Sequence, residues 1–348
     1  MAKAEVLSFT DALETIQEAQ KKHLLLGNGF SIALKPDIFT YGSLLDNADF
    51  TAIPHVPALF EALKTKDFEI VIRHLQDAAT VVEIYKPEML DLAAKLRADA
   101  AAVKDALVSA IAIRHPDRPY DIADAQYAAC RSFLNNFDRI YTLNYDVLLY
   151  WSIMQDSVDD LDIRHDDGFR HPEDDYDQPY VSWQEANSAT VSFLHGALHL
   201  FDAGHEITKY TWSKTDKPIV EQIREALAQN KYPLFVAEGS SQSKRTRILH
   251  NAYLDKALRS FKQSCSPAKN SIVIYGHSLA ENDKHILRCI AKGAASHLLV
   301  SLYGDVTSDL NQTVIRNAQK LVQLRAALRE RNPLQVVFFD AATANVWG

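Results

Sequence analysis

Four short polar motifs punctuate the chain and contain residue types that could do chemistry. They are Gly-Asn-Gly-Phe-Ser at 27–31, Thr-Leu-Asn-Tyr-Asp at 142–146, His-Gly at 195–196 and Gly-His-Ser at 276–278. Each lies at or directly after an apolar run with the pattern of a buried strand. Because the carboxyl ends of parallel strands open onto one crevice, we expect the four motifs to share one site.

The first motif has the composition of a phosphate-binding turn. Gly27 and Gly29 allow a phosphate to approach the backbone, the following helix start offers N–H groups, and Ser31 adds a hydroxyl. A simple tight turn has the same spacing. The following residues, among them Ala33 and Leu34, do not continue the glycines of a dinucleotide-binding dehydrogenase, and no acidic strand end follows about 20 residues later, which disfavours hydride transfer.

The second and third motifs contain the candidate catalytic groups. Asn144 can orient a ribose hydroxyl or a water. Its side-chain amide stands at a strand end and does not cap a helix, so it needs other hydrogen-bond partners. Asp146 can accept hydrogen bonds from a ribose or cap the helix that begins there. His195, before a glycine at a strand end, is placed as a general base, whereas His199 lies in a predicted hairpin and is expected to be structural.

The fourth motif is predicted to complete the binding site. Gly276 permits close approach, and Ser278 can bond a ribose or a phosphate. Asp283 is a further candidate, although it can equally serve as a helix N-terminal charge. For His277 and His285 a surface or packing role is the preferred interpretation.

Two other polar clusters could either bind a ligand or consist of ordinary solvent-exposed residues. Three basic residues stand at a predicted helix start after Glu238, namely Lys244, Arg245 and Arg247. They could contact phosphates at the rim of the crevice, or they could lie on a solvated face of the helix. An acidic segment at 155–179 contains groups of metal-ligand type, but such density in an exposed loop usually has no specific ligand, so no metal is expected: His165, Asp166, Asp167 and His171.

The elements that must position these motifs follow from the apolar pattern. Near-continuous apolar runs, typical of strands covered on both faces, occur at 23–27, 139–144, 190–196, 271–278, 297–305 and 334–341. Amphipathic helical patterns occur at 8–22, 244–263, 281–294 and 309–331. This alternation predicts an α/β fold, a Rossmann-like, doubly wound and mostly parallel sheet.

The domain organisation is predicted to be one domain over 1–348 that carries an insertion. Residues 52–136 fall between the first two strands, are too many for one crossover helix, and have helical composition. The acidic stretch at 155–179, with Gly and Pro, predicts an exposed loop. Residues 198–212 alternate around Asp-Ala-Gly-His and predict a β-hairpin.

The overall composition excludes several classes of protein. With 37 Lys and Arg against 45 Asp and Glu, the net charge of −8 argues against direct binding to nucleic acid or an anionic membrane, although a local basic groove is not excluded. The three cysteines form no Cys-x-x-Cys pair and are expected to be small buried side chains. No signal-peptide pattern and no apolar run of membrane-spanning length occurs, so we expect a cytoplasmic location.

Together the four motifs, in the same order, resemble the sirtuin-like domain family. The resemblance implies NAD as the bound nucleotide, Asn144 and His195 as catalytic residues, and a binding site formed by Gly27, Asn28, Gly29, Phe30, Ser31, Thr142, Asp146, Gly196, Gly276, His277, Ser278 and Asp283. The Gly-Asn-Gly-Phe-Ser form, Phe-Thr-Tyr-Gly-Ser-Leu at 39–44 and residues 233–248 resemble in particular the bacterial sirtuin-like proteins of anti-phage and abortive-infection defence.

The sequence also departs from the deacetylase sirtuins. Their four-cysteine zinc module is absent, and Ile-Ala-Leu-Lys-Pro-Asp-Ile-Phe at 32–39 replaces their Gly-Ile-Pro-Asp-Phe-Arg continuation. The resemblance therefore implies a nicotinamide ribose pocket without an acyl-lysine platform. It predicts an NAD hydrolase, with NAD as substrate, no metal, and conditional activation as an effector of antiviral defence.

Two other functions stay open at this point. The protein could bind NAD or ADP-ribose as a sensor without hydrolysing it, or could transfer ADP-ribose or an acyl group. By analogy with defence systems, the expected partners are NAD or a related nucleotide, further copies of the chain in a homo-oligomer, and a partner ATPase or phage-derived trigger.

Overall fold

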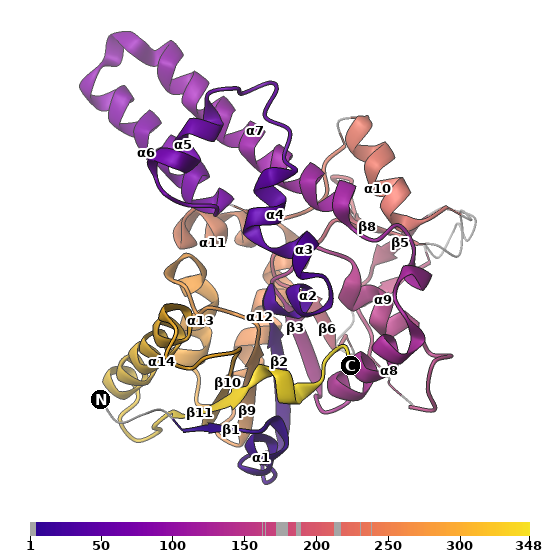
Figure 1. Ribbon diagram of the computed structural model, residues 1–348. Coiled ribbons are helices and arrows are strands. Elements are labelled where there is room, and N and C mark those ends of the chain that lie inside the picture. The colour runs from indigo at the N-terminus through magenta and orange to yellow at the C-terminus, as the bar shows by residue number, and fades with distance from the viewer. Residues whose placement is uncertain are drawn as a thin grey trace.

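The apolar runs predicted as strands form the centre of a seven-stranded parallel sheet. In this computed structural model the structure describes residues 5–161, 163, 165–171, 180–185, 189–211, 217–229, 231–237 and 239–348, with the side chain of Tyr41 excepted. The sheet contains β1 (Val6–Leu7), β2 (Lys21–Leu26), β3 (Arg139–Thr142), β6 (Val191–Phe193), β9 (Asn270–Tyr275), β10 (His297–Leu302) and β11 (Gln335–Asp340). Every pair of neighbours is parallel, which confirms the predicted Rossmann-like α/β class (Figure 1).

The order of the strands fixes where a crevice can form. Across the sheet the order is β1-β11-β10-β9-β2-β3-β6. From β2 the chain proceeds outward through β3 and β6 on one side, and from β9 through β10 and β11 on the other. The direction of winding therefore reverses between β2 and β9, which is the place where open α/β sheets bind ligands.

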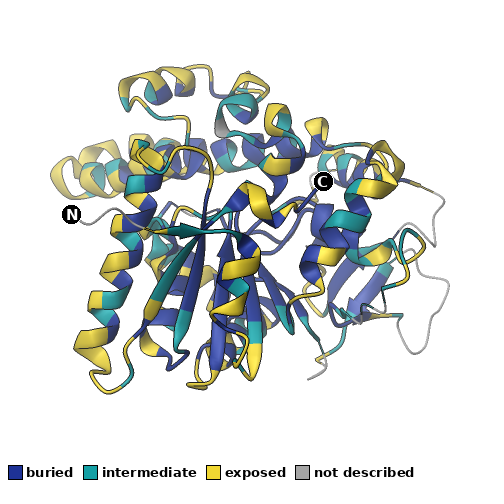
Figure 2. Ribbon diagram, turned by 60° about the horizontal axis from the view of Figure 1, so that its bottom comes forward, coloured by how far each residue is buried: buried dark blue, intermediate teal, exposed yellow. Residues whose placement is uncertain are grey.

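The strands are covered on both faces, as their sequence pattern predicts. Leu24, Leu25 and Leu26 of β2 are fully buried, as are Ile272 and Val273 of β9. Figure 2 shows the strands buried between layers of helices. The covering helices include α1 (Phe9–Glu14), α9 (Leu148–Met154), α12 (Ala252–Ser264), α13 (Lys284–Lys292) and α14 (Asp309–Leu328).

Two predicted helices have different bounds in the structure. The pattern at 8–22 predicts one helix, but α1 ends at Glu14 and Lys21 already belongs to β2. The pattern at 244–263 is divided into α11 (Ser241–Leu249) and α12. The division occurs at Asn251, whose Oδ1 accepts a hydrogen bond from the Leu254 N–H at 3.1 Å and starts a new helix.

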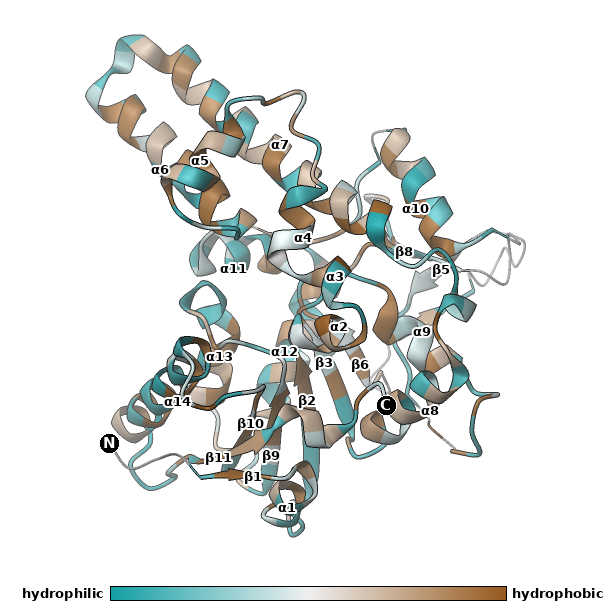
Figure 3. Ribbon diagram, in the orientation of Figure 1, coloured by the Kyte–Doolittle hydropathy of each residue, from teal (hydrophilic) through white to brown (hydrophobic). Residues whose placement is uncertain are grey.

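Helices fill the long connection between β2 and β3, which includes the predicted insertion at 52–136. They are α2 (Gly29–Leu34), α3 (Pro36–Phe39), α4 (Tyr41–Asp46), α5 (Val56–Ala62), α6 (Phe68–Tyr85), η1 (Pro87–Met89), α7 (Leu90–Arg114), η2 (Pro119–Asp121) and α8 (Asp124–Leu134). The long helices α6 and α7 pack side by side as a hairpin that extends away from the sheet (Figure 1). Both carry hydrophobic and hydrophilic residues along their length (Figure 3), and apolar side chains near the far end are exposed: Val81, Ile84, Tyr85, Met89 and Leu90.

A second, antiparallel sheet stands beside the parallel one. It has the order β4 (Phe169–Arg170), β5 (Tyr180–Trp183), β8 (Ile207–Tyr210) and β7 (Leu200–Asp202), and is followed by α10 (Ile219–Ala228). Strands β7 and β8 pair antiparallel, which confirms the predicted hairpin.

The acidic segment at 155–179 is only partly described, since residues 162, 164 and 172–179 lie outside the described residues. Its described part is not wholly an exposed loop, because β4 lies within it and the Phe169 side chain is buried. Asp166 forms an ion pair with Arg170 at 2.5 Å, and Asp167 pairs with the buried Lys209. Asp166 and Asp167 thus have partners within the protein.

Cys130 and Cys265 are buried and Cys289 is half-buried, all as free thiols, in agreement with the prediction of small packed side chains. Across the described ranges, none of the helices has the length and apolar character that crossing a membrane would demand.

Several histidines are buried in the fold, and His115 provides a test of their effect on stability. Its Nδ1 donates to the Pro116 carbonyl at 2.9 Å and its Nε2 accepts from the Val147 N–H at 3.3 Å, so the ring is neutral. Burial lowers its pKa to about 4. Between pH 6.5 and 4 the unfolded chain binds a proton at His115 that the folded chain does not, so stability falls as the pH decreases.

We expect His115→Gln to flatten this pH dependence. Between pH 6.5 and 4.5 the free energy of unfolding of the variant should fall by about 2 to 3 kcal/mol less than that of the unchanged protein. Urea unfolding at a series of pH values measures both slopes. His205→Gln, at a side chain that is 80% exposed, is the control; an equal slope for His115→Gln and the unchanged protein would contradict the assignment.

Candidate functional site

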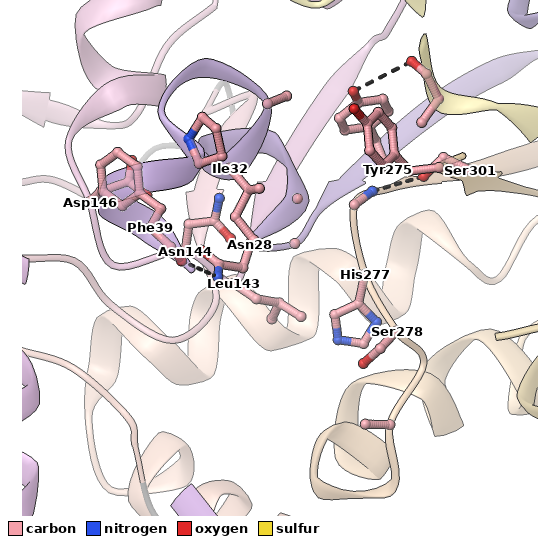
Figure 4. Close-up of a pocket in the computed structure, with 18 of the residues that line it drawn as sticks. Asn28, Ile32, Phe39, Leu143, Asn144, Asp146, Tyr275, His277, Ser278 and Ser301 are labelled. Atoms are coloured by element: carbon pink, nitrogen blue, oxygen red, sulfur yellow. Dashed lines mark hydrogen bonds between the residues drawn. The ribbon is translucent and has the colours of Figure 1, made fainter. Parts of the chain in front are cut away.

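A cavity of about 800 Å³ opens where the parallel strands end, at the point of reversal between β2 and β9. Most of the predicted site residues line it: Gly27, Asn28, Gly29, Asn144, Asp146, His195, Gly276, His277, Ser278 and Asp283. Four predicted residues are buried and lie outside this lining: Phe30, Ser31, Thr142 and Gly196. In Figure 4, Asn28 and Asn144 lie on one side of the cavity and His277 and Ser278 on the other.

The glycines of the first and fourth motifs hold two loops against each other. The Gly29 N–H donates to the Gly276 carbonyl at 2.8 Å. A Cβ on Gly29 would lie 2.5 Å from the Gly276 Cα, and one on Gly27 would lie 2.6 Å from the His277 Cβ. Gly276 has φ of +70°, which favours glycine by itself. These glycines therefore allow two backbones to meet at the switch point of the sheet.

This contact changes the expectation that the first motif presents free N–H groups. The N–H groups of Gly29, Phe30 and Ser31 already donate, to the carbonyls of Gly276, Gly27 and Asn28 respectively. The Asn28 side-chain amide donates to the Phe39 carbonyl at 2.9 Å. The expectation is therefore wrong for these three backbone groups, since the loop satisfies them itself.

The side chain of Asn144 is fixed by a chain of buried hydrogen bonds. Its Nδ2 donates to Ser31 Oγ at 3.0 Å, and Ser31 Oγ donates to Asp146 Oδ2 at 2.5 Å. Thr142 Oγ1 accepts from the Asn144 N–H at 3.0 Å. Ser31 and Thr142 thus act on Asn144, whose amide oxygen is left for a ligand.

Asp146 serves the helix-start role that the sequence allows, while its contact with a ribose stays a prediction. Its Oδ1 accepts from the Leu148 N–H at 2.9 Å at the start of α9, and its Oδ2 accepts from Ser31. Burial raises the pKa of this carboxyl group above its ordinary value. Since Asp146 also lines the cavity, it joins the helix start to the hydrogen-bond chain of Asn144.

A buried ionic cluster stands beside His195, and no sequence motif predicted it. The Nζ atom of Lys244, on α11, lies 2.7 Å from Glu69 Oε2 and 2.8 Å from Asp283 Oδ1. Glu69 comes from α6 and also accepts from Asn282 Nδ2 at 2.6 Å. Lys244 is 1% exposed, so its interpretation as a solvated side chain is wrong. It lines the cavity, and its contact with a phosphate stays a prediction. Its spacing of four from the buried Ile248 is the one signal that places it on the inner face of the helix.

Contacts among the side chains of this cluster determine the protonation state of each one. Burial raises the pKa of Asp283, but the Lys244 ammonium and the His277 bond outweigh it and hold this pKa well below its usual range. Burial, helped by the negative charges of Asp283 and Asp67, raises the pKa of Glu69 to about 7 although the Lys244 ammonium acts in the opposite direction. The pKa of Lys244 is raised by the two carboxylates despite its burial. Asp283 is therefore the permanently ionised partner.

His195 is held in a row of hydrogen-bonded side chains. Its Nε2 lies 3.1 Å from His285 Nε2, and His285 Nδ1 lies 3.2 Å from Ser241 Oγ. Asp283 Oδ1 lies 3.8 Å from the same Nε2 of His195, and Asp283 Oδ2 lies 3.0 Å from His277 Nε2. Burial lowers the pKa of His195 well below its ordinary value, so the ring is neutral near pH 7.

His199, expected to be structural, packs against Tyr150 with ring centroids 5.0 Å apart.

His195, Asp283 and His285 could in principle hold a metal ion, since one ligand atom from each lies within 4.8 Å of the others. The Lys244 ammonium already contacts the same Asp283 oxygen at 2.8 Å. A fixed positive charge at this distance repels a second cation, so the donor set does not fit a resident metal.

Residues 24–347 match a family model described as Domain of unknown function (DUF4917). The chain belongs to this family. The match begins within β2 and ends one residue before the last, so it includes all four motifs and nearly the whole lining of the cavity. A search of curated proteins finds no match to the chain.

The contact between the glycine loops predicts a clear difference between two substitutions. Gly29→Ala places a methyl group against the Gly276 backbone, so we expect the free energy of unfolding to fall by about 1 to 3 kcal/mol. Gly42→Ala is the control, since its Cβ would meet only the flexible Lys66 side chain, within α4. Thermal and urea unfolding measure both; equal stability of the two variants would contradict the loop contact.

Removing the buried ammonium should be far more costly than removing its exposed neighbour. Lys244→Met leaves Glu69 and Asp283 side by side without a cation, so we expect a loss of about 3 to 5 kcal/mol of stability. Arg245→Met, at the next and exposed position, should change stability by less than about 0.5 kcal/mol. Urea unfolding at pH 7 compares them, and a small effect of Lys244→Met would argue against the buried cluster.

Proposed function

We propose that this protein hydrolyses NAD⁺ at the bond between nicotinamide and ribose. The observation that carries the proposal is that Asn144 and His195 line one cavity, which the two glycine loops of the first and fourth motifs also line. A volume of about 800 Å³ lies in the range of small-molecule and cofactor sites. NAD is the substrate in this proposal, and no metal takes part.

Hydrolysis of this bond makes modest demands on a site. Nicotinamide leaves as a neutral molecule, so no general acid is needed, while positive charge develops on the ribose. The Asn144 amide nitrogen is held by Ser31, which leaves the amide oxygen to accept a hydrogen bond from a ribose hydroxyl or the attacking water. Ser31, Thr142 and Asp146 are positioning residues for this amide.

His195 supplies a base in the correct charge state. A neutral imidazole can take a proton from the attacking water or a ribose hydroxyl. The imidazolium that forms lies with its Nε2 at 3.8 Å from Asp283 Oδ1, a carboxylate kept ionised by Lys244. This charge stabilises the protonated ring as the carboxylate of a catalytic triad does.

The base function requires one particular tautomer. With Nε2 of His195 bonded to His285, the nitrogen available to the cavity is Nδ1, which must carry a lone pair. His195 then donates from Nε2, His285 accepts at Nε2, and His285 keeps its own proton on Nδ1 toward Ser241 Oγ. Ser241 and His285 therefore determine whether His195 can act.

The wider role follows from the resemblance alone. A conditionally activated effector of anti-phage defence in the cytoplasm, a homo-oligomer, and a partner ATPase or phage-derived trigger stay predictions. Uncontrolled loss of NAD would harm the host, so the activity should depend on a signal. Sedimentation of the purified protein with and without NAD measures the oligomeric state.

Nicotinamide release from NAD⁺ tests the reaction. Asn144→Ala and His195→Ala should each lower kcat by at least about 10²-fold, because each removes a group that acts on the reacting atoms. His205→Ala, in the exposed turn between β7 and β8, is the control and should retain the activity. Chromatography of the products with purified protein measures all four.

Each other outcome selects a different function. Calorimetric binding of NAD without nicotinamide release would overturn hydrolysis and select a sensor. Transfer of labelled ADP-ribose to a protein acceptor would select a transferase. Unchanged turnover in both Asn144→Ala and His195→Ala would show that another site performs the reaction.

A further inference from the structure

A second cavity, of about 940 Å³, lies on the side of α11 away from Lys244, between α11, α12 and α13. We call it the basic groove. Its lining contains eight cationic side chains, namely Arg73, Arg245, Arg259, Lys262, Lys284, Arg288, Lys292 and Arg329, against two carboxylates, Asp255 and Glu281. Such a concentration of cationic side chains is unexpected in a chain whose net charge is −8.

Five of these eight cations have no carboxylate partner among the described residues. Arg259 pairs with Asp255 at 2.5 Å and Lys284 pairs with Glu281 at 2.7 Å, so both acidic groups of the lining are already used. Arg73 pairs with Asp77, outside the lining, at 3.5 Å. In the part of the chain that the structure describes, the others form no ion pair: Arg245, Lys262, Arg288, Lys292 and Arg329. Like charges that gather without counter-charges attract anions.

The rest of the lining indicates which kind of anion fits. The first residues of α11, Ser241 and Gln242, and its N-cap Ser240 line the groove, so the positive end of this nine-residue helix adds to the side-chain charges. Arginine groups bind phosphate with paired hydrogen bonds. Among the lining residues the one aromatic ring is the imidazole of His285, so the groove offers no platform on which the bases of a nucleic acid strand would stack.

The groove and the first cavity share a wall. Asn282 lines both cavities, and two neighbouring residues of α11 line different ones, Lys244 the first cavity and Arg245 the groove. His285 lines the groove and bonds to His195, which lines the first cavity. A ligand in the groove is thus two hydrogen bonds from the proposed base.

We propose that the basic groove binds a small ligand carrying several phosphate groups, and that its occupation switches on the base at His195. The binding stands on the groove alone, whereas the switching rests on the proposed hydrolysis of NAD. A nucleotide-sized molecule suits the volume, and its phosphates supply the missing counter-charges.

The coupling passes through Ser241. Its Oγ accepts from the His285 N–H at 2.8 Å and lies 3.2 Å from His285 Nδ1. A phosphate oxygen that accepts the Ser241 hydroxyl proton turns an oxygen lone pair toward Nδ1, which then keeps its proton. His285 Nε2 becomes an acceptor for His195 Nε2–H, and Nδ1 of His195 is left with its lone pair toward the cavity. Each ring keeps one proton throughout.

Calorimetric titration with inorganic tripolyphosphate tests the binding. We expect micromolar affinity, a loss of at least tenfold in the double variant Arg245→Glu with Arg288→Glu, and a change of less than twofold in Arg316→Glu, an exposed position of α14 outside the groove. No binding to the unchanged protein, or an equal loss in Arg316→Glu, would overturn the proposal. A 20-nucleotide single-stranded DNA that binds more than tenfold tighter than tripolyphosphate would overturn the choice of a small ligand.

Histidine-selective ¹⁵N NMR tests the coupling without relying on catalysis. Addition of tripolyphosphate should move Nδ1 of His195 toward the shift of an unprotonated nitrogen, with His195→Gln used for assignment, and Ser241→Ala should abolish the movement while tripolyphosphate still binds. Nicotinamide release should rise at least fivefold with tripolyphosphate in the unchanged protein and not in Ser241→Ala. Unmoved histidine shifts would overturn the coupling, whereas moved shifts without any nicotinamide release would overturn the proposed hydrolysis and leave the coupling intact.

Discussion

The buried ammonium of Lys244 joins three segments that are far apart in the sequence. It brings Glu69 of α6, Asp283 of η3 (Glu281–Asp283) and its own helix α11 to one point beside His195. The ammonium offsets part of the negative charge of the two carboxyl groups, which lowers the free-energy cost of burying the three groups together, and the raised pKa of Glu69 reflects the remainder. The position of the helical connection over the sheet therefore depends on this contact, and so does the ionised state of Asp283.

The meeting of the two glycine loops fixes the geometry of the cavity from the other side. Gly29 and Gly276 stand at the ends of β2 and β9, where the winding of the sheet reverses, and their backbones touch. This contact sets the separation between the two halves of the site. With Asn144 held by Ser31 and Asp146, the groups that would face a ligand are positioned by buried hydrogen bonds instead of by flexible side chains.

Helix α11 separates two environments of opposite charge. The first cavity is lined by carboxyl groups and one paired ammonium, while the basic groove is lined by eight cations, five of which lack a carboxylate partner among the described residues. The row from Ser241 through His285 to His195 crosses this wall. A neutral imidazole can carry its proton on either ring nitrogen. A change in the hydrogen bond at Ser241 can therefore change the tautomer of His285 and then that of His195 without movement of the backbone.

The sequence by itself determined the fold class, six of the strands and the four motifs at their ends, because a strand covered on both faces needs a continuous apolar run and the carboxyl ends of parallel strands converge. It did not determine the break in the helix at Asn251, the use of the glycines to join two loops, or the partners of Lys244. Glu69 lies in a helix whose pattern gives no sign of a role, and its neighbours come from residues about 175 and 215 positions away along the chain. Local pattern records only which face of an element is buried. Tertiary structure alone decided which buried charges meet, since a pairing between distant elements leaves no periodic signal in either of them.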